Sequence, residues 1–253
     1  MDEHSLRLRC AGHSDVGRRA NNEDTFFLQP GLGLFVVADG MGGYEGGEVA
    51  SAVVVHALHD FFHRHRVDED GTWPIRPDRG RGPLEAMVDV GLQRAHRDVV
   101  ALKRGELSRM GSTALVTVFR RGRIVVGNIG DSRLYRLRDG TLERLTRDHS
   151  VAEELSRRGG PVAPGFQHCL TRAVGMPEAG RADVTGHALH DQDVYLLCTD
   201  GLWDVLHPDT IAEYLALDPL AACDGLIEAA HAAGSRDNIT AVVVEVQRSG
   251  RMP

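Results

Sequence analysis

Three aspartates occupy the same kind of position in this sequence, directly after an apolar run and beside a glycine. They are Asp39 in LFVVADGMGG, Asp131 in VGNIGDSRLYR and Asp200 in VYLLCTDGLWD. A short apolar run favours a buried strand, and an aspartate at its end can be delivered into a cleft at the sheet edge. One such residue commonly does no more than close a turn. Three of them together predict a shared site.

Further carboxylates accompany these three, namely Glu23 and Asp24 in NNED and Asp237 in SRDNIT. Carboxylates gathered from several strand ends would repel one another strongly unless cations neutralised them. Every candidate ligand is a hard oxygen donor, which favours Mg²⁺ or Mn²⁺ over softer metals. Gly40 adds to this set, because a glycine lets the backbone approach closely and can offer its carbonyl as a ligand.

The composition is that of an ordinary globular protein, with 42% hydrophobic and 26% charged residues in 253. The formal charge of −7 argues against a nucleic-acid partner, which normally requires a basic excess. The four cysteines are far apart in the sequence, and we expect reduced thiols. We find no signal-peptide pattern and no apolar run long enough to span a membrane, so we expect a cytoplasmic protein without a membrane partner.

Short strand-like runs dominate the sequence and must position these carboxylates. The apolar, alternating or β-branched pattern predicts strands at residues 6–10, 34–38, 114–119, 124–126, 193–199 and 239–246. The stretch RLYRLRDGTLERLT predicts a hairpin that turns at Asp139 and Gly140, because an Asp-Gly pair fits the tight turn of a hairpin.

Helical periodicity appears in fewer places. Apolar stripes predict long helices at residues 48–65 and 84–102, and a further helix is expected at 219–233. A shorter helix should begin at Ser150, where Glu153 completes a capping box. Residues 67–82 are rich in Asp, Arg, Gly and Pro, which is typical of an exposed loop. Without a repeat or a long linker, the pattern indicates one α+β domain over 1–253.

Eight blocks of this sequence resemble the metal-dependent protein phosphatases of the protein phosphatase 2C type, particularly the bacterial single-domain members. From about Gly12 to Val246 the blocks are SDVGRRANNEDTF, FVVADGMGGYEGGEVAS, GSTALVTV, VGNIGDSRLYR, LTRDHS, LTRAVG, LLCTDGLWDVL and SRDNITAVVV. The resemblance implies a four-layer α-β-β-α sandwich of two antiparallel sheets flanked by helix pairs. It also implies a flap, at about 151–169, beside a metal site in a cleft at one edge.

The resemblance implies a role for each residue of the metal core. Asp39 would bridge two Mg²⁺ or Mn²⁺ ions. Asp200 and Asp237 would complete the first metal site, and Glu23 with the carbonyl of Gly40 would complete the second.

The remaining site residues are assigned by the same resemblance. Asp24 would hold metal-bound water, and Arg19 would bind the substrate phosphate. Asp131 would bind a third, weaker metal that it shares with Asp200, although a role in closing the turn before Ser132 is the alternative.

The resemblance implies hydrolysis of phosphoserine and phosphothreonine on proteins by direct attack of water. Two divalent ions can activate a shared water and offset charge on the phosphoryl oxygens. The arginine adds a planar fork matched to phosphate. No cysteine has an arginine six residues later, so the loop of cysteine-dependent phosphatases is absent.

The sequence departs from the family in two places. Met41 stands where animal members often have a histidine interpreted as the general acid, so the proton donor stays open, with metal-bound water as the favoured candidate. The flap is several residues shorter than in typical bacterial relatives and lacks their acidic stretch.

Several residues have a plainer interpretation. The three histidines of the first long helix, His56, His59 and His63, are expected on its solvated face. We expect Cys198 and Trp203 to pack in the core. His149, in TRDHS, belongs to a family block, but a structural hydrogen bond near the helix cap is at least as good an interpretation.

Phosphorylated proteins, including a Ser/Thr protein kinase and its targets, are the partners that the resemblance implies, and we expect a monomer. Two other functions are kept in view. One is a phosphatase dedicated to a single regulatory phosphoprotein, and the other is an inactive module that only binds phosphoproteins. The inactive module is disfavoured because all the expected metal-binding carboxylates are present.

Overall fold

Two antiparallel sheets form the centre of the computed structural model, which describes residues 6–42, 46–65, 82–161, 166, 168–176 and 181–248. The exposed loop predicted at 67–82 lies outside the described residues except for Gly82. No helix in these described ranges has the length and apolar character that crossing a membrane requires.

The first sheet has the strand order β1-β11-β10-β7-β8, with each neighbouring pair antiparallel. Its strands are β1 (Leu6–Asp15), β7 (Arg133–Arg138), β8 (Thr141–Arg144), β10 (Val194–Cys198) and β11 (Ile239–Arg248). Helices α4 (Asp200–Trp203), α5 (Pro208–Leu215) and α6 (Pro219–Ala232) pack on its outer face.

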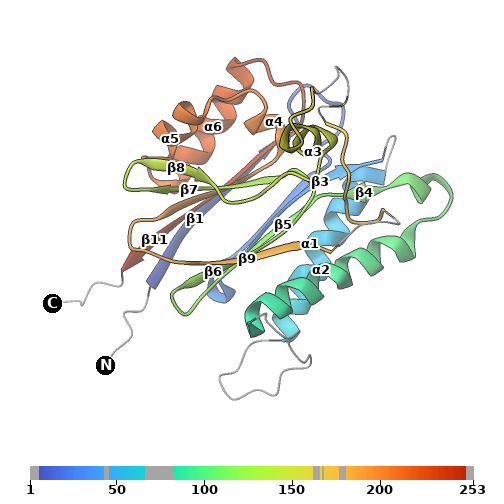
Figure 1. Ribbon diagram of the computed structural model, residues 1–253, viewed down its shortest axis with the longest axis horizontal. Coiled ribbons are helices and arrows are strands. Elements are labelled where there is room, and N and C mark those ends of the chain that lie inside the picture. The colour runs from blue at the N-terminus through green and yellow to red at the C-terminus, as the bar shows by residue number, and fades with distance from the viewer. Residues whose placement is uncertain are drawn as a thin grey trace.

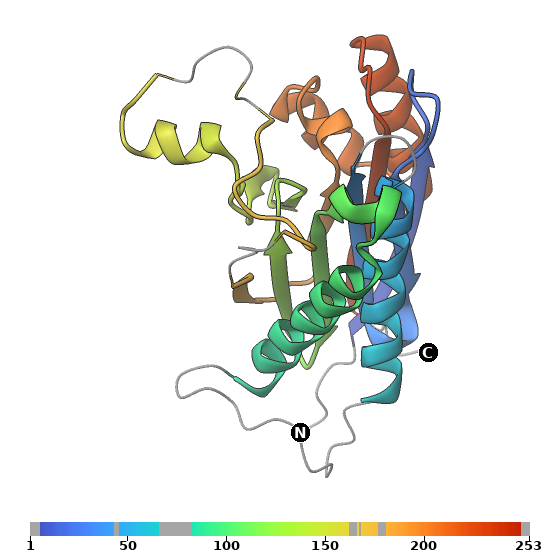
Figure 2. The ribbon, with the colours of Figure 1, turned by 90° about the vertical axis from the view of Figure 1, so that its right-hand side faces the viewer.

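The second sheet has the order β2-β3-β5-β6-β9, and a short strand, β4, pairs with β3. The strands are β2 (Asp24–Gln29), β3 (Leu34–Met41), β4 (Gly111–Ser112), β5 (Ala114–Arg120), β6 (Arg123–Ile129) and β9 (Asp183–Ala188). Helices α1 (Gly46–Arg64) and α2 (Pro83–Leu102) cover its outer face, as Figure 1 and Figure 2 show.

The alternation of side chains along β3 explains why this layering is stable. Val36 and Ala38 face the helices α1 and α2, whereas Phe35 and Val37 face the other sheet and join the core between the sheets. Strands buried on both faces are expected to be continuously apolar rather than alternating. The four-layer α+β sandwich predicted from the family resemblance is confirmed.

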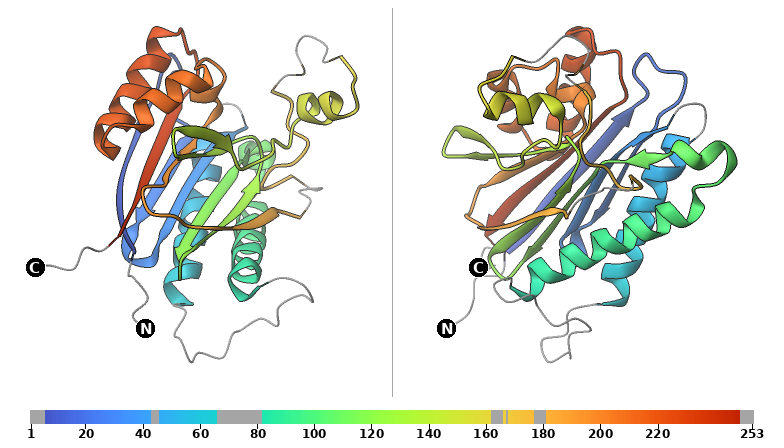
Figure 3. Two further views of the ribbon diagram at one scale, coloured as in Figure 1. Left: turned by 60° about the vertical axis from the view of Figure 1, so that its left-hand side comes forward. Right: turned by 45° about the vertical axis from the view of Figure 1, so that its right-hand side comes forward.

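The short helix α3 (Val151–Arg157) stands off from the two sheets, as Figure 2 and Figure 3 show. It lies in the predicted flap and begins as the sequence indicates, because Oγ of Ser150 accepts a hydrogen bond from the backbone N–H of Glu153 at 3.2 Å. Gly159, with φ of +71°, follows the helix where a left-handed residue is favoured.

The predicted hairpin is also confirmed, since β7 and β8 are joined by Asp139 and Gly140, both with positive φ as a type I′ turn requires. Sequence patterns missed several elements, namely β2, β4, β9, α4, α5 and the 3₁₀ turns η1 (Pro30–Leu32) and η2 (Gly105–Arg109). β9 has only one neighbouring strand and is mostly exposed, so it lacks the apolar pattern of the central strands.

Candidate metal centre

Strand ends from both sheets bring the expected carboxylates to one edge of the sandwich. Asp24 at the start of β2 is paired in register with Asp39 near the end of β3. Asp200 begins α4 directly after β10, and Asp237 lies two residues before β11. The ends of β10 and β11 are adjacent, because Cys198 pairs with Ala241, so the residues flanking these ends are adjacent too.

The pKa of Asp39 shows how closely these groups gather. Burial of the side chain is the largest cause that raises this pKa well above its usual range. The charges of Asp24, Asp200, Asp131 and Asp237 raise it further, in that order. A carboxyl group whose charge is opposed by four neighbours fits a site made for cations.

The other buried acids behave in the same way. Burial, with the charge of Asp200 next, raises the pKa of Asp131 to about 7. Burial, with the charge of Asp237 next, raises the pKa of Asp200 to about 6. Burial likewise raises the pKa of Asp24 to about 7, although hydrogen bonds from two threonines oppose the rise.

Among the acids that the structure describes at this edge, two buried carboxylate oxygens have no hydrogen-bond partner, Oδ1 of Asp24 and Oδ1 of Asp200. Leaving such an oxygen unsatisfied is costly, by about 1–3 kcal/mol for a neutral group and more for a charged one. A hard cation or the water it carries would satisfy both atoms, so the residues present fit Mg²⁺ or Mn²⁺.

Glu23 and Gly40 lie together, as the family resemblance implies. The backbone N–H of Gly40 donates to the carbonyl of Glu23 at 3.1 Å. A Cβ on residue 40 would lie 2.1 Å from the carbonyl oxygen of Gly47, and a Cβ on Gly47 would lie 2.5 Å from Cδ of Glu23. Glycines at both positions are therefore required for the start of α1 to approach the Glu23 carboxylate.

Thr113 connects two of the candidate ligands. Its Oγ1 accepts a hydrogen bond from the backbone N–H of Asp39 at 2.8 Å, and its own N–H donates to the Asp39 carbonyl at 2.8 Å. The same Oγ1 lies 2.7 Å from Oγ of Ser132, the residue after Asp131. One buried threonine thus holds the end of β3 against the turn that carries Asp131.

Arg133 fixes the turn of Asp131 from the other side. Its guanidinium is bidentate on Asp148, with Nη2 to Oδ2 at 2.6 Å, and it lies 3.4 Å over the ring of Trp203. Trp203 belongs to the same short helix as Asp200, so Arg133 connects the elements that carry Asp131 and Asp200.

Arg19 reaches this edge from the loop after β1. Its Nη2 lies 2.6 Å from Oδ2 of Asp237. The loop itself packs against the backbone of Asp237, because a Cβ on Gly17 would lie 1.9 Å from the Asp237 carbonyl oxygen. The expected phosphate-binding residue therefore lies beside an expected metal ligand.

Sequence reasoning missed the polar residues that support the acids. Oδ2 of Asp24 accepts hydrogen bonds from Thr199 at 2.8 Å and Thr240 at 2.7 Å. Oδ1 of Asn238 accepts from the backbone N–H of Glu23 at 2.8 Å, while its amide donates to backbone carbonyls of the loop after β1. Each stands next to or near an aspartate in a quoted block, which is the signal that could have identified it.

His168 was also missed. It lies in the flap, with Nδ1 3.7 Å from Oδ2 of Asp200 and Nε2 3.9 Å from Oδ2 of Asp204. Of the plainer predictions, Cys198 is buried in the core as expected. His56 is exposed on α1, and His59 is partly covered by the ring of Phe27, with centroids 4.7 Å apart.

No three side chains of His, Cys, Asp or Glu are already gathered as a finished metal-binding group in the part of the chain that the structure describes. Mutual repulsion opposes a closer approach of like-charged carboxylates, and a divalent cation would draw them together. The structure brings the acids to one edge, where a cation could draw them closer.

Comparison with known proteins agrees with this fold. The family model described as "Protein phosphatase 2C" matches residues 11–223. The serine/threonine protein phosphatase PstP of Mycobacterium tuberculosis is 35% identical over 255 residues, covering 96% of this chain and 46% of that protein. This chain therefore spans about half the length of that relative. The serine/threonine phosphatase stp of Listeria monocytogenes is 30% identical, with 92% of this chain and 93% of that protein covered.

Solved structures give the same result. The catalytic domain of PstP in complex with two manganese ions matches with a TM-score of 0.81 at 35% identity, covering 96% of this chain and all of that chain. PppA of Pseudomonas aeruginosa matches with a TM-score of 0.76 at 32% identity, again covering 96% of this chain and all of that one. The fold is that of the bacterial serine/threonine phosphatases. The chain belongs to the protein phosphatase 2C family.

Proposed function

We propose that this chain is a metal-dependent phosphatase that hydrolyses phosphoserine and phosphothreonine on proteins by direct attack of water. The observation that carries the proposal is the buried carboxyl of Asp39, whose pKa is raised by burial and by four neighbouring aspartates. Family membership and relatives with this activity support it. One catalytic domain over 1–253 is part of the proposal.

The proposed metal ligands are those that the sequence predicts. Asp39 would bridge two ions, Asp200 and Asp237 would complete one site, and Glu23 with the Gly40 carbonyl would complete the other. Mn²⁺ is the ion named in the PstP catalytic-domain structure, and Mg²⁺ has the same oxygen preference. When bound, such ions lower the pKa of water and offset charge on the phosphoryl oxygens. Asp131 would hold a weaker third ion together with Asp200.

The other residues act on substrate and water. Arg19 would bind the phosphate oxygens through its fork of N–H groups. The unpartnered Oδ1 of Asp24 would accept a hydrogen bond from a water in the site, while Thr199 and Thr240 hold its other oxygen. Met41 has no proton to give, and a water of the site is the favoured donor to the departing alkoxide.

The substrates follow from this chemistry. We infer that phosphorylated proteins are the partners, with a Ser/Thr protein kinase and its targets as the expected class, and that the chain acts as a cytoplasmic monomer. A phosphatase dedicated to one regulatory phosphoprotein would carry the same site. Comparing phosphoproteomes with and without the gene separates the two, because only a general phosphatase changes many phosphosites.

Chelation tests the proposal directly. The purified chain should hydrolyse p-nitrophenyl phosphate and phosphothreonine peptides in Mn²⁺ or Mg²⁺, lose this activity in EDTA, and regain it when the metal is returned. Okadaic-type inhibitors should have little effect. Full activity in chelator would contradict the proposal, and binding of phosphopeptide without any turnover would support an inactive binding module instead.

A further inference from the structure

His149 is a buried histidine that the proposed reaction does not use. It lies between β8 and α3 in the block LTRDHS, and only 1% of the residue is exposed. A buried imidazole is costly unless its nitrogens have partners. Its contacts therefore show what holds it there.

The first set of contacts is with Gly130, the residue before Asp131. The backbone N–H of His149 donates to the carbonyl of Gly130 at 2.9 Å, and the N–H of Gly130 donates to Nδ1 of the imidazole at 3.1 Å. His149 thus contacts both polar groups of the Gly130 backbone, and the side-chain amide of Asn128 also donates to the Gly130 carbonyl, at 3.3 Å. Gly130 has φ of +108°, and a Cβ there would lie 2.6 Å from Cγ2 of Thr113, so this conformation requires glycine.

The second set of contacts is with the base of the flap. The carbonyl of His149 accepts a hydrogen bond from the N–H of Thr171 at 2.8 Å. Ser150 forms an isolated antiparallel bridge with Leu170, and the N–H of Val151 donates to the carbonyl of Cys169 at 2.8 Å. The chain enters and leaves the flap side by side at His149.

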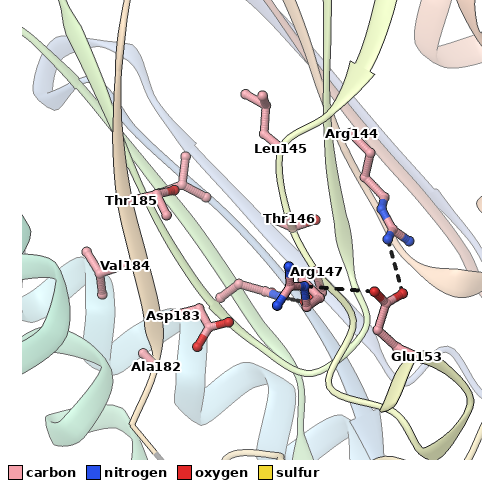
Figure 4. Close-up of a pocket in the computed structure, with 11 residues that line it drawn as sticks. Arg144, Leu145, Thr146, Arg147, Glu153, Ala182, Asp183, Val184 and Thr185 are labelled. Carbon is pink, nitrogen blue, oxygen red and sulfur yellow. Dashed lines mark hydrogen bonds and ion pairs between the residues drawn. The ribbon is translucent and has the colours of Figure 1, made fainter. Parts of the chain in front are cut away.

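Ion pairs fasten the flap helix near the same point. Glu153 on α3 lies 3.1 Å from Arg144 and 3.9 Å from Arg147, which Figure 4 shows beside a cavity of about 620 Å³. The first turn of α3 is therefore attached to the segment after β8 that leads to His149.

A third contact lies at the other end of the ring. Because the Gly130 N–H donates to Nδ1, the proton of the neutral imidazole is on Nε2. This nitrogen lies 3.1 Å from Oδ2 of Asp183 on β9, close enough for an ion pair but without the geometry of a hydrogen bond. Burial lowers the pKa of His149, which agrees with a neutral ring. Arg172, from the segment that leaves the flap, also contacts Asp183 at 3.0 Å.

We propose that His149 is a positioning residue that ties the base of the flap to Gly130 and thereby sets the position of Asp131. This inference rests on the proposed function, in which Asp131 helps to hold the weak third metal. In this proposal His149 acts through Gly130 and needs no contact of its own with substrate or metal. Its effect is to make the occupancy of that third site depend on the placement of the flap.

Two substitutions of His149 test the contacts of its two ring nitrogens one at a time. In His149→Asn, the amide oxygen can occupy the place of Nδ1 and accept from Gly130, but the contact with Asp183 is lost. In His149→Gln, the longer amide can reach Asp183 while the Gly130 N–H is left without an acceptor. The two variants have similar polarity, so each serves as the matched control for the other.

Calorimetric titration with Mn²⁺ is the first readout. We expect His149→Gln to weaken the third, weakest site by about tenfold, the effect of one lost buried hydrogen bond, with the two tighter sites unchanged. His149→Asn should stay within about threefold of the unsubstituted protein. Equal behaviour of the two variants, or a normal third site in folded His149→Gln, would overturn the proposal.

Amide hydrogen exchange on the metal-free protein is the second readout, and it does not depend on metal or activity. In His149→Gln the amides of Gly130 and Thr171 should both lose protection, and in His149→Asn both should keep it. Faster exchange at Gly130 alone would overturn the coupling to the flap. If the unsubstituted protein neither binds Mn²⁺ nor hydrolyses phosphopeptides, the proposed function fails, and this exchange pattern still decides the role of His149.

Discussion

Arg19 and Asp237 form an ion pair, with Nη2 of the guanidinium 2.6 Å from Oδ2 of the carboxylate. Both side chains are well exposed, so the pair itself stabilises the fold by no more than about 0–1 kcal/mol. In the proposed site one partner binds phosphate and the other binds metal, so the pair shows that the phosphate-binding and metal-binding groups lie side by side.

Substitution of Arg19 should therefore separate phosphate binding from metal binding. Arg19→Ala should lower kcat/KM by about 10- to 150-fold, the effect of losing a charge-assisted contact of about 1.5–3 kcal/mol. Mn²⁺ affinity, measured by calorimetry, should be unchanged or slightly higher, because Asp237 loses a competing cation. Arg19→Lys, which keeps the charge but loses the planar fork, should fall in between. A collapse of Mn²⁺ binding in Arg19→Ala would contradict the assignment.

Substitution of Asp39 should lower the turnover rate more than substitution of any other proposed ligand. Asp39→Ala removes an oxygen ligand from both core ions at once, so activity should fall below about a tenth of the unsubstituted protein and approach zero. The fold should persist, because removing a carboxyl group with a raised pKa relieves repulsion. Phosphatase assays beside circular dichroism check both parts. Turnover above a tenth would show that Asp39 does not bridge the metals.

The raised pKa of Asp131 predicts a pH-dependent stability in the metal-free protein. The pKa of Asp131 is about 7 in the folded protein, compared with an ordinary value of 3.8. The folded state therefore favours the protonated carboxyl group. As pH rises from about 4 to about 7, ionisation of this group lowers the free energy of unfolding. Asp131→Asn lacks this titration. Its melting temperature relative to the unsubstituted protein should rise between pH 5 and pH 8, by about 3 °C or more.

Comparing Asp131→Asn with the unsubstituted protein at each pH cancels the contributions of other titrating groups to thermal stability. His149, which is buried, and His96 and His187, which are partly buried, have pKa values lowered by burial, so they destabilise the fold below about pH 6.5 and would mask the effect in one protein alone. Saturating Mn²⁺ should reduce the pH dependence of the difference in melting temperature between the two proteins. A difference that falls from pH 5 to pH 8 would contradict the prediction.

The sequence shows the acids of the site because each follows a local pattern. Asp39 and Asp200 follow apolar runs in the sequence. The structure places Asp39 near the end of β3, and Asp200 at the start of α4, two residues after the end of β10. These strands are buried on both faces, so their apolar runs are continuous and easily recognised. The four-layer arrangement, in contrast, needed the family resemblance, because periodicity indicates only α+β.

The supporting network could not be predicted from local patterns. Thr240 contacts Asp24 across 216 positions of sequence, and Thr113 contacts Ser132 across two strands. Such pairs depend on strand order and register, which a single sequence does not display. His149 illustrates the same limit, since its block is visible in the sequence but its partner Gly130 is visible only in the fold.

Substitution of Asp131 distinguishes two roles for this residue, ligand of a third metal or closure of a turn. A site with few protein carboxylates should be weak, because affinity falls with the number of charged oxygens supplied. Asp131→Ala should therefore leave the two-metal core occupied, reduce activity, and require more Mn²⁺ to approach saturation. The side chain is only 5% exposed, and burial and the charge of Asp200 oppose its ionisation, so its removal should leave thermal stability unchanged or raised. A turn residue would give the reverse, with a lower melting temperature and unchanged turnover per folded molecule. Melting curves beside Mn²⁺ titrations of activity distinguish the two, and normal turnover at every Mn²⁺ concentration would remove Asp131 from the site.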